Sequence, residues 1–180
     1  MVDSPDPRLS DQEIGGLDFR IARPDNDAFL AEMVIAACFP PWSSPSVEQA
    51  RAFPHAARWL SPPPGSGDVI VVGCLGNRPI GAAIGRCFNN LVPCWGVIAA
   101  DIPELAIAIT APERGRGYGR AILDYWLQCL LLRGHRSASL TVGVINSAGL
   151  RLYARCGFAE VERDARRVLM RWDAPESIAG

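Results

Sequence analysis

The segment 113–120, ERGRGYGR, places three glycines and three arginines between an apolar segment and an amphipathic one. The first N–H groups of a helix have no acceptor within the helix, and the helix dipole favours negative charge beside them. Glycines let a phosphate group approach the backbone, and arginines add positive charge around it. These residue types in this order predict an anion-binding turn at the start of a helix.

The spacing of the glycines narrows the type of anion site. They stand at positions 115, 117 and 119, so the segment lacks the G-x-G-x-x-G pattern of dinucleotide-binding turns. The chain also lacks G-K-[ST], because all 18 of its basic residues are arginines. A surface turn whose arginines are merely solvated is the alternative interpretation of the same residues.

Strands and helices must position this turn, and hydrophobic periodicity predicts where they lie. Alternation over 104–110 predicts a strand that leads into the turn. An apolar stripe from Gly117 to Arg133 predicts the helix that follows, and Gly134 stands where that helix should end. The turn is therefore expected to join a strand to a long helix.

The remaining elements follow from the same patterns. Strands are predicted at 17–24, 69–75, 79–88, 138–145, 158–163 and 166–172, and helices at about 28–37, at 146–157 and in two short pieces within 47–60, where Pro54 interrupts the pattern. Residues 88–103 are predicted to be an irregular connection. This order predicts the α/β (α+β) class, with one mixed, mostly antiparallel sheet flanked by helices.

Length and composition indicate one globular domain. The 180 residues are 49% hydrophobic and carry a net charge of −1, which gives no general attraction to nucleic acid or to anionic membranes. We expect the domain to occupy 17–172, between flexible tails at 1–16 and 173–180. No apolar run reaches the length of a membrane span, and the N-terminal segment lacks the apolar core of a signal peptide.

Cysteines and histidines give no sign of a metal site. The six cysteines have no C-x-x-C spacing, and His55 and His135 lie far from one another in the chain. We expect the cysteines to be buried thiols of a protein in the reducing cytosol. The sequence therefore predicts a cytoplasmic protein, monomeric or homodimeric, that binds no metal.

Two groups of residues, in order along the chain, resemble the signature of a known enzyme family. The turn reads R-x-x-G-x-G from Arg114, and the next predicted strand is followed by Asn146, by Tyr153 and by CGF at 156–158. This pattern resembles the GCN5-related N-acetyltransferase (GNAT) family over about 102–160. The resemblance implies the acyl-CoA N-acyltransferase fold, with two splayed parallel central strands, and acetyl-CoA as cosubstrate.

The resemblance also implies which residues bind acetyl-CoA. In the family, the pantetheine arm lies between the two splayed strands, here 104–110 and 139–145, and pairs with backbone of the first. The pyrophosphate lies on the amides of the glycine turn, and an asparagine at the last helix adds a polar contact. The residues so implied are Ile107, Ala108, Ile109, Arg114, Gly115, Arg116, Gly117, Tyr118, Gly119, Arg120 and Asn146. The alternative role of Asn146 is that of a plain helix N-cap.

The resemblance implies direct attack of a neutral amine on the thioester, with an acid near the leaving sulfur. Tyr153 holds the position of that acid, and its alternative role is packing. A phenol is a weaker acid than a thiol, so its hydroxyl is expected chiefly to hydrogen-bond the sulfur. The backbone N–H of Ile109 is the candidate donor to the carbonyl oxygen.

The catalytic base departs from the family pattern. Many relatives carry a glutamate in the strand before Asn146, where this chain has Thr141. That departure makes Glu104, at the start of the preceding strand, the leading candidate, acting through water. Asp101 and His55 are further candidates, and a solvated Glu104 that only orients the substrate ammonium is the alternative.

The acceptor side of this fold is built from the first two helices and the connection before the first splayed strand. Aromatic residues are frequent there, namely Phe39, Trp42, Phe53, Trp59 and Trp95, and acidic residues are few. The predicted function is acetyl transfer to a primary amine of a small molecule or of a protein N-terminus, and a compact or amphipathic amine fits better than a polycationic one. The alternatives are a non-catalytic acyl-CoA sensor or interaction module, and transfer of longer acyl chains.

Overall fold

The structure is a computed structural model that describes residues 12–14, 16–22, 27–40, 42–60, 68–88 and 95–175. The strands in these ranges are β1 (Gln12–Ile14), β2 (Leu17–Ile21), β3 (Val69–Leu75), β4 (Arg78–Arg86), β5 (Glu104–Ile109), β6 (Ser137–Gly143), β7 (Ala159–Arg163) and β8 (Arg167–Asp173). The helices are α1 (Asp27–Cys38), α2 (Val47–Arg51), α3 (Pro54–Ala57), α4 (Tyr118–Leu132) and α5 (Ser147–Arg155), with a short 3-10 helix, η2 (Ala111–Glu113), before α4.

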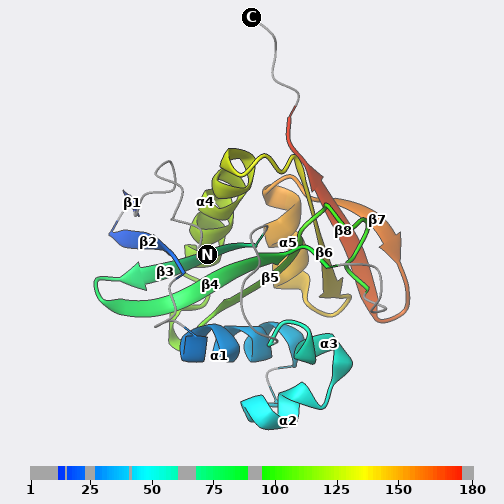
Figure 1. Ribbon diagram of the computed structural model, residues 1–180, viewed down its shortest axis with the longest axis horizontal. Helices are drawn as coiled ribbons and strands as arrows, with labels where there is room; N and C mark the ends of the chain where they lie inside the picture. The colour runs from blue at the N-terminus through cyan, green and yellow to red at the C-terminus, as the bar shows by residue number, and fades with distance from the viewer. Residues whose placement is uncertain are drawn as a thin grey trace, which may run out of the picture.

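The strands form one sheet in the order β1-β2-β3-β4-β5-β6-β8-β7. Neighbouring strands run antiparallel except for β5 and β6, which lie at the centre and run parallel. Helices α1, α2 and α3 lie on one side of the sheet, and α4 and α5 lie on the other (Figure 1). The predicted mixed, mostly antiparallel fold is confirmed.

The sheet begins earlier in the chain than the sequence indicated. Residues 12–14, within the expected flexible tail, form β1 and pair antiparallel with β2. Three residues are too few to show a periodicity, so the pattern revealed only β2, which ends at Ile21. At the other end, β8 runs to Asp173, just beyond the expected domain boundary.

Strand β5 separates two hydrophobic cores. Its side chains Leu105, Ile107 and Ile109 belong to the core beneath α4. Ala106 and Ala108 belong to the core beneath α1. The alternation predicted from the sequence is therefore confirmed, and each face of β5 can be followed residue by residue into the site.

Helix α4 is anchored to the sheet through Trp126. This side chain is fully buried, and its indole N–H donates to the Val69 carbonyl at 2.9 Å. A buried indole needs such a partner, so the ring can sit in only one way. Because α4 follows the glycine turn directly, this contact also fixes the direction of its first turn.

A proline divides the second helical segment, as predicted. Ser46 and Gln49 form a capping box at the start of α2. Pro54 stands in the first turn of α3, where its missing N–H has no intrahelical partner to lose. The break ends the helical path early, so that Arg58 follows α3 directly and reaches the start of β5.

The described residues contain no membrane-spanning helix and no cluster of metal ligands. None of the described helices is both long and apolar enough to cross a bilayer. Over the same ranges, no three His, Cys, Asp or Glu side chains lie together in a way that could hold a metal ion. Five cysteines are free thiols, and Cys94 lies outside the described residues.

Candidate active site

The parallel strands β5 and β6 meet at one point and then diverge. Glu104 lies opposite Ser139, and the Ser139 N–H donates to the Pro103 carbonyl at 2.9 Å. Within the described residues this is the single register pair between the two strands, although β5 stays paired with β4 and β6 with β8. The sheet therefore opens beside the C-terminal half of β5, as the resemblance implied.

The register with β4 determines which backbone groups of β5 face this gap. The Thr110 N–H donates to the Ile80 carbonyl at 2.8 Å, so every second residue of β5 pairs its amide and carbonyl with β4. The intervening residues, Ile107 and Ile109, direct these groups toward β6. Ala108 pairs with β4, so its backbone is not available to a ligand in the gap, in contrast to the role that the resemblance implied.

The glycine turn begins where β5 ends. After η2, Gly115 and Gly117 have φ values of 76° and 88°, a region that favours glycine over other residues. Gly117 is the N-cap of α4, so the unpaired amides of the first helical turn begin with the next residue. Gly119 lies outside that φ region, and a Cβ there would be 3.6 Å from atoms of Ile109 and Leu152. A side chain is therefore tolerated at 119 and strained at 117.

A buried carboxylate organises the arginines beneath the turn. Glu113 is buried, accepts a hydrogen bond from Arg78 at 2.8 Å, and lies 3.5 Å from Arg116. Arg114 turns back to β5, where its Nε donates to the Ile109 carbonyl at 2.9 Å. The turn is thus tied both to the β3–β4 hairpin and to the end of β5.

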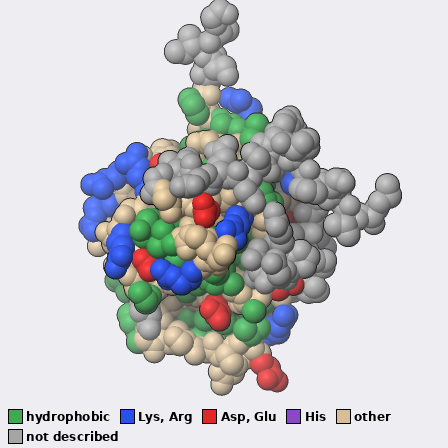
Figure 2. Space-filling view, turned by 90° about the vertical axis from the view of Figure 1, so that its left-hand side faces the viewer, with side chains coloured by type: hydrophobic (Ala, Val, Ile, Leu, Met, Phe, Trp, Pro, Cys, Tyr) green, Lys and Arg blue, Asp and Glu red, His purple; other side chains and the backbone are tan. Residues whose placement is uncertain are grey.

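The same end of the molecule is rich in arginine. Arg120, in the first turn of α4, pairs with Asp124 at 3.3 Å and stays at the surface. Figure 2 views the molecule from the end where the β3–β4 turn lies, and arginine side chains (blue) surround a hydrophobic area there with only a few carboxylates (red). Positive charge around a helix N-terminus is what binding of a phosphate requires.

Asn146 caps α5. Its Oδ1 accepts a hydrogen bond from the Gly149 N–H at 2.9 Å, which confirms the N-cap interpretation. The residue is exposed and lies just beyond the end of β6. Its contact with a cofactor stays a prediction.

Tyr153 lies on α5, on the same side of the sheet as α4. It is half-buried against the core beneath α4, and its ring is 5.9 Å from that of Phe158. Burial, reinforced by the neighbouring Cys156 thiol, raises the pKa of Tyr153 to about 12. The hydroxyl therefore keeps its proton at neutral pH and can serve as a hydrogen-bond donor.

Glu104 is not the solvated carboxylate that the sequence left open. It is buried on the α1 side of the sheet, forms an ion pair with Arg58, and lies against the backbone of Gly96. Burial raises the pKa of the Glu104 carboxyl above its usual 4.5, and the charge and hydrogen bond of Arg58 offset part of that rise. A carboxylate poised in this way is better suited to accept a proton at neutral pH than an exposed one. Asp101, one of the other candidates for the base, is exposed.

Aromatic side chains from separate segments form a ring layer above this pair. Each ring contacts the next. The centroid distances are 5.4 Å for Phe39 and Phe53, 5.9 Å for Phe53 and His55, and 6.3 Å for His55 and Trp95. The Arg167 guanidinium lies 3.3 Å from the centroid of Trp95. Burial and the nearby Arg58 lower the pKa of His55 below its usual value, so its ring is neutral at pH 7.

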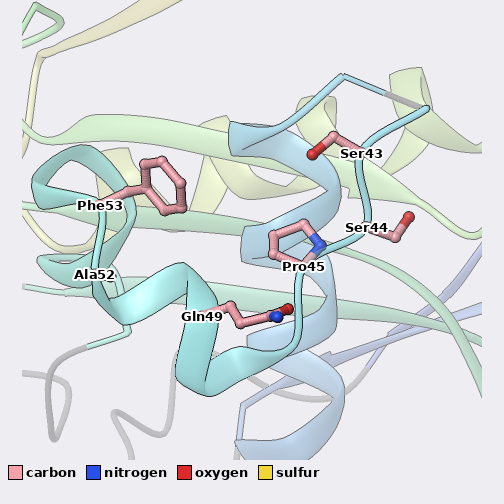
Figure 3. A pocket seen from close by; sticks show the side chains of 6 residues that line it. All are labelled: Ser43, Ser44, Pro45, Gln49, Ala52 and Phe53. Atoms are coloured by element: carbon pink, nitrogen blue, oxygen red, sulfur yellow. The ribbon is translucent and has the colours of Figure 1, made fainter.

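The other predicted aromatics lie apart from this layer. Trp59 belongs to the core, whereas Trp42 is 78% exposed. Near Trp42, an open hollow of about 560 Å³ lies between the end of α1 and the α2–α3 turn. Figure 3 shows Pro45, Gln49 and Phe53 around it. The hollow adjoins the ring layer at Phe53 and contains none of the predicted catalytic or cofactor residues.

Comparison with protein families then assigns the chain. The acetyltransferase (GNAT) family matches residues 28–158, which is more than half of the chain. The chain belongs to this family. It is an acetyltransferase, with acetyl-CoA as its cosubstrate.

Solved structures share the fold of this acetyltransferase at low sequence identity. A candidate acetyltransferase, YncA, from Salmonella typhimurium, solved with its cofactor acetyl-CoA, is 16% identical, with a TM-score of 0.65 over 92% of this chain and 98% of that one. A candidate phosphinothricin N-acetyltransferase is 17% identical, with a TM-score of 0.65 over 89% and 99%. A GCN5-related N-acetyltransferase from Kribbella flavida is 20% identical, with a TM-score of 0.64 over 88% and 98%. Comparison with curated proteins gives no match.

The residues of this acetyltransferase fit acetyl-CoA on two structural grounds. Gly115 and Gly117 hold a turn in which nothing would lie within 4 Å of an added Cβ, so the backbone is open to a phosphate. Ile107 and Ile109 direct backbone groups into a gap that β6 leaves unfilled in the described structure. An extended polar chain such as pantetheine can pair with such an edge.

Sequence reasoning missed two side chains of this acetyltransferase that the fold brings to the start of β5, namely Arg58, which directly follows α3, and Ser139 of β6. It also missed Arg167 of β8, which lies opposite Gly143 at the end of β6 and contacts the Trp95 ring. Arg58 and its partner Glu104 are 46 residues apart, and no spacing rule links them. The one available signal was the unusual count of aromatic residues around Arg58.

Proposed function

We propose that this enzyme transfers the acetyl group of acetyl-CoA to a primary amine, on a small molecule or on a protein N-terminus, by direct attack of the amine. The observation that carries the proposal is the single Glu104–Ser139 bridge, beyond which β5 and β6 leave a gap through the sheet. A gap at this point lets one substrate approach from each face. Acetyl-CoA supplies the acetyl thioester, and the chain supplies position, hydrogen bonds and proton transfer.

The glycine turn and the end of β5 hold the cosubstrate in this proposal. The amides of the first turn of α4 and the side chains of Arg114, Arg116 and Arg120 bind its phosphates. Ile109, whose carbonyl already accepts from Arg114, contacts the pantetheine next to the turn through its N–H. The N–H of Ile107, which lies closer to Glu104, is the proposed donor to the thioester oxygen in place of that of Ile109. Ala108 contributes contact only, because its backbone groups pair with β4.

The two proposed proton-transfer residues lie on opposite faces of the sheet. Tyr153 packs on the α4 side and Glu104 lies on the α1 side, with the gap between them. In the proposal, Glu104 takes the amine proton through water, and the amine nitrogen forms a bond to the acetyl carbon. As the carbon–sulfur bond breaks, the Tyr153 hydroxyl donates a hydrogen bond to the sulfur, the nitrogen loses its remaining excess proton, and coenzyme A leaves as the thiol.

The experiment that tests the function is release of free thiol from acetyl-CoA in the presence of a panel of amines. We expect release with at least one primary amine, and an acetylated amine of matching amount by mass spectrometry. Release at the same rate without any amine would contradict the proposal, because it would indicate hydrolysis. Thiol release should disappear when the amine nitrogen is dimethylated, because a tertiary amine stays basic but has no N–H to lose when an amide forms.

Binding of the cosubstrate is tested separately from turnover. Coenzyme A at a hundred times its dissociation constant should raise the free energy of unfolding by about 2.7 kcal/mol. NAD and ATP at the same concentration should have much smaller effects, and equal shifts from all three would mean that the turn binds anions without selectivity. Strong stabilisation by coenzyme A together with no acetylation of any amine would favour the sensor.

A further inference from the structure

Three side chains close to the β5–β6 bridge have buried polar atoms without a partner. In the described part of the chain, Arg58 Nε and Nη1, Ser139 Oγ and Thr141 Oγ1 make no hydrogen bond. The Arg58 side chain is 9% exposed, and Ser139 is fully buried. An unmade hydrogen bond on a buried group costs about 1–3 kcal/mol, and a charged donor more. Several of them close together need an explanation.

These three side chains lie on the same face of the sheet. Ala138, Leu140 and Val142 of β6 pack in the core beneath α4. Because side chains alternate along a strand, Ser139 and Thr141 point to the α1 side, where Arg58 lies. Ser139 is the register partner of Glu104, and Glu104 is the ion-pair partner of Arg58. Arg58 and Ser139 therefore both lie next to Glu104, and Thr141 lies two residues beyond Ser139 on the same face of β6.

The Arg58 guanidinium is held by aromatic rings. Its Cζ lies 4.0 Å from the ring centroid of Phe88 and 5.3 Å from that of Trp59. Stacking of this kind fixes the plane of the guanidinium, so its free donors are presented in one orientation. Nη2 is bonded to Glu104, and the free Nε–H and Nη1–H groups leave from different edges of the guanidinium. Either edge can donate a charge-assisted hydrogen bond to a carboxylate oxygen.

The charges at this point select one class of ligand. Arg58 and Glu104 together carry no net charge, so a lone carboxylate bound here would leave a net negative charge in a buried site. A lone ammonium would leave a net positive one. A zwitterion, with its ammonium at Glu104 and its carboxylate at Arg58, leaves the site neutral, which avoids the large free-energy cost of an unpaired buried charge.

We propose that Arg58, Ser139 and Thr141 form a carboxylate subsite, and that the acceptor is a free α-amino acid. The inference rests on the proposed acetylation of an amine, and it decides between the two kinds of acceptor left open there. A protein N-terminus has a neutral amide carbonyl in place of the carboxylate, so it offers these donors one acceptor oxygen and no negative charge. A free amino acid satisfies them and places its amine at Glu104.

The first experiment measures binding without turnover. Each common α-amino acid is added to the full-length protein saturated with coenzyme A, and the melting temperature is recorded. The amino acid that stabilises most is then compared with its own amide and with the amine formed by its decarboxylation. We expect the free acid to bind at least tenfold more tightly than either. Equal affinities for the three compounds, or stabilisation by no amino acid, would overturn the proposal.

Single substitutions test which side chains cause the preference for the free acid. Arg58→Gln removes the charge, and the preference for the free acid over the amide should fall to about one. Ser139→Ala should lower the preference for the free acid by a factor of a few and leave the Arg58–Glu104 pair intact. This variant therefore decides the test if Arg58→Gln does not fold. Ser137→Ala is the matched control: Ser137 lies on the same face of β6, but its hydroxyl is already bonded to Asp173 and Arg171. An unchanged acid preference in Ser139→Ala, or an equal loss in Ser137→Ala, would contradict the subsite.

The two proposals fail in different ways. Acid-selective stabilisation without thiol release from acetyl-CoA would keep the subsite and overturn amine acetylation. Thiol release with amines and amino acid amides, without preference for the free acid, would keep acetylation and overturn the subsite. A buried water molecule as the sole occupant would give the second result, because it would pair with the three donors whichever amine is bound.

Discussion

The two faces of the sheet differ in how their polar groups are used. On the α4 side the buried surface is almost entirely apolar, and its buried indole has a carbonyl partner at Val69. On the α1 side, the region around the β5–β6 bridge holds an ion pair, two hydroxyls and a neutral histidine. The first face stabilises the fold and carries the residues of the family signature. Burying the polar groups of the second face costs free energy of folding, and the proposed amino acid would supply the hydrogen bonds that they lack.

The largest expected effect comes from removal of the Tyr153 hydroxyl on the α4 side. In Tyr153→Phe the ring stays, so packing against Phe158 and the affinity for coenzyme A should change little. Turnover at saturating substrates should fall by about 10²–10⁴-fold. Because the pKa of Tyr153 is raised to about 12, the hydroxyl is protonated throughout the accessible pH range, and the loss should be the same at every pH. Turnover near that of the wild type, measured with the true acceptor, would contradict the role of Tyr153.

On the α1 side, Glu104→Gln should give a loss that depends on pH. At neutral pH the rate should fall by about a hundredfold, because the ammonium of the acceptor loses its base. At high pH the amine is already neutral, so the rate should recover. In the wild type, burial raises the pKa of Glu104, so the decline in rate on acidification should set in above pH 4.5, where the carboxylate takes up its proton. A rate profile of the same shape in both proteins would remove Glu104 from proton transfer.

A smaller effect is expected from the glycine turn, where binding can be separated from folding. Gly117→Val places a branched side chain at a φ of 88°, and the affinity for coenzyme A should fall by about tenfold or more. Gly134→Val is the matched control, because Gly134 has a φ of 84° beyond the other end of α4. Both variants should unfold at lower urea concentration, whereas only the first should bind coenzyme A weakly. Equal loss of affinity in both would mean that the strain acts through the fold.

The smallest effect expected is on stability, and it concerns the unpartnered hydroxyl. Ser139→Ala should leave the free energy of unfolding unchanged or raise it by up to about 1 kcal/mol, since the hydroxyl is buried without a hydrogen bond. Ser137→Ala should lower it slightly, because that hydroxyl is bonded. Urea unfolding of the two variants gives the comparison. A loss of stability in Ser139→Ala that exceeds the loss in Ser137→Ala would mean that Ser139 has a structural role.

The sequence predicted one face of the site better than the other, and the reason is physical. The glycine turn, Asn146 and Tyr153 lie within one stretch of chain, so local rules of capping and spacing are sufficient to find them. Glu104 was found as the start of a strand, yet its burial depends on Arg58 and Gly96, which no local rule connects to it. Ala108 was predicted to bind acetyl-CoA because alternation in a single strand does not reveal which neighbouring strand its backbone faces. That information lies in the register with β4.

The helices and strands also differ in whether local sequence or distant pairing determines them. The proline at 54 predicted two short helices correctly, because a proline acts on its own turn. Strand β1 was missed, because its three residues are held only by pairing with β2. Arg58 and Ser139 meet Glu104 at the start of β5 from two separate segments, so this arrangement is a property of the folded chain.

The single bridge between β5 and β6 also has a mechanical consequence. Strands β1 to β5 and strands β6 to β8 are two separate ladders, joined through Glu104 and Ser139 and spanned by α4. Local separation of the two ladders can therefore extend from the open end of the gap to that bridge, because few backbone hydrogen bonds between β5 and β6 oppose it. An extended ligand in the gap supplies backbone hydrogen bonds to both strands. In native-state hydrogen exchange, the two ladders should therefore unfold as one unit when coenzyme A is bound, and independently when it is absent.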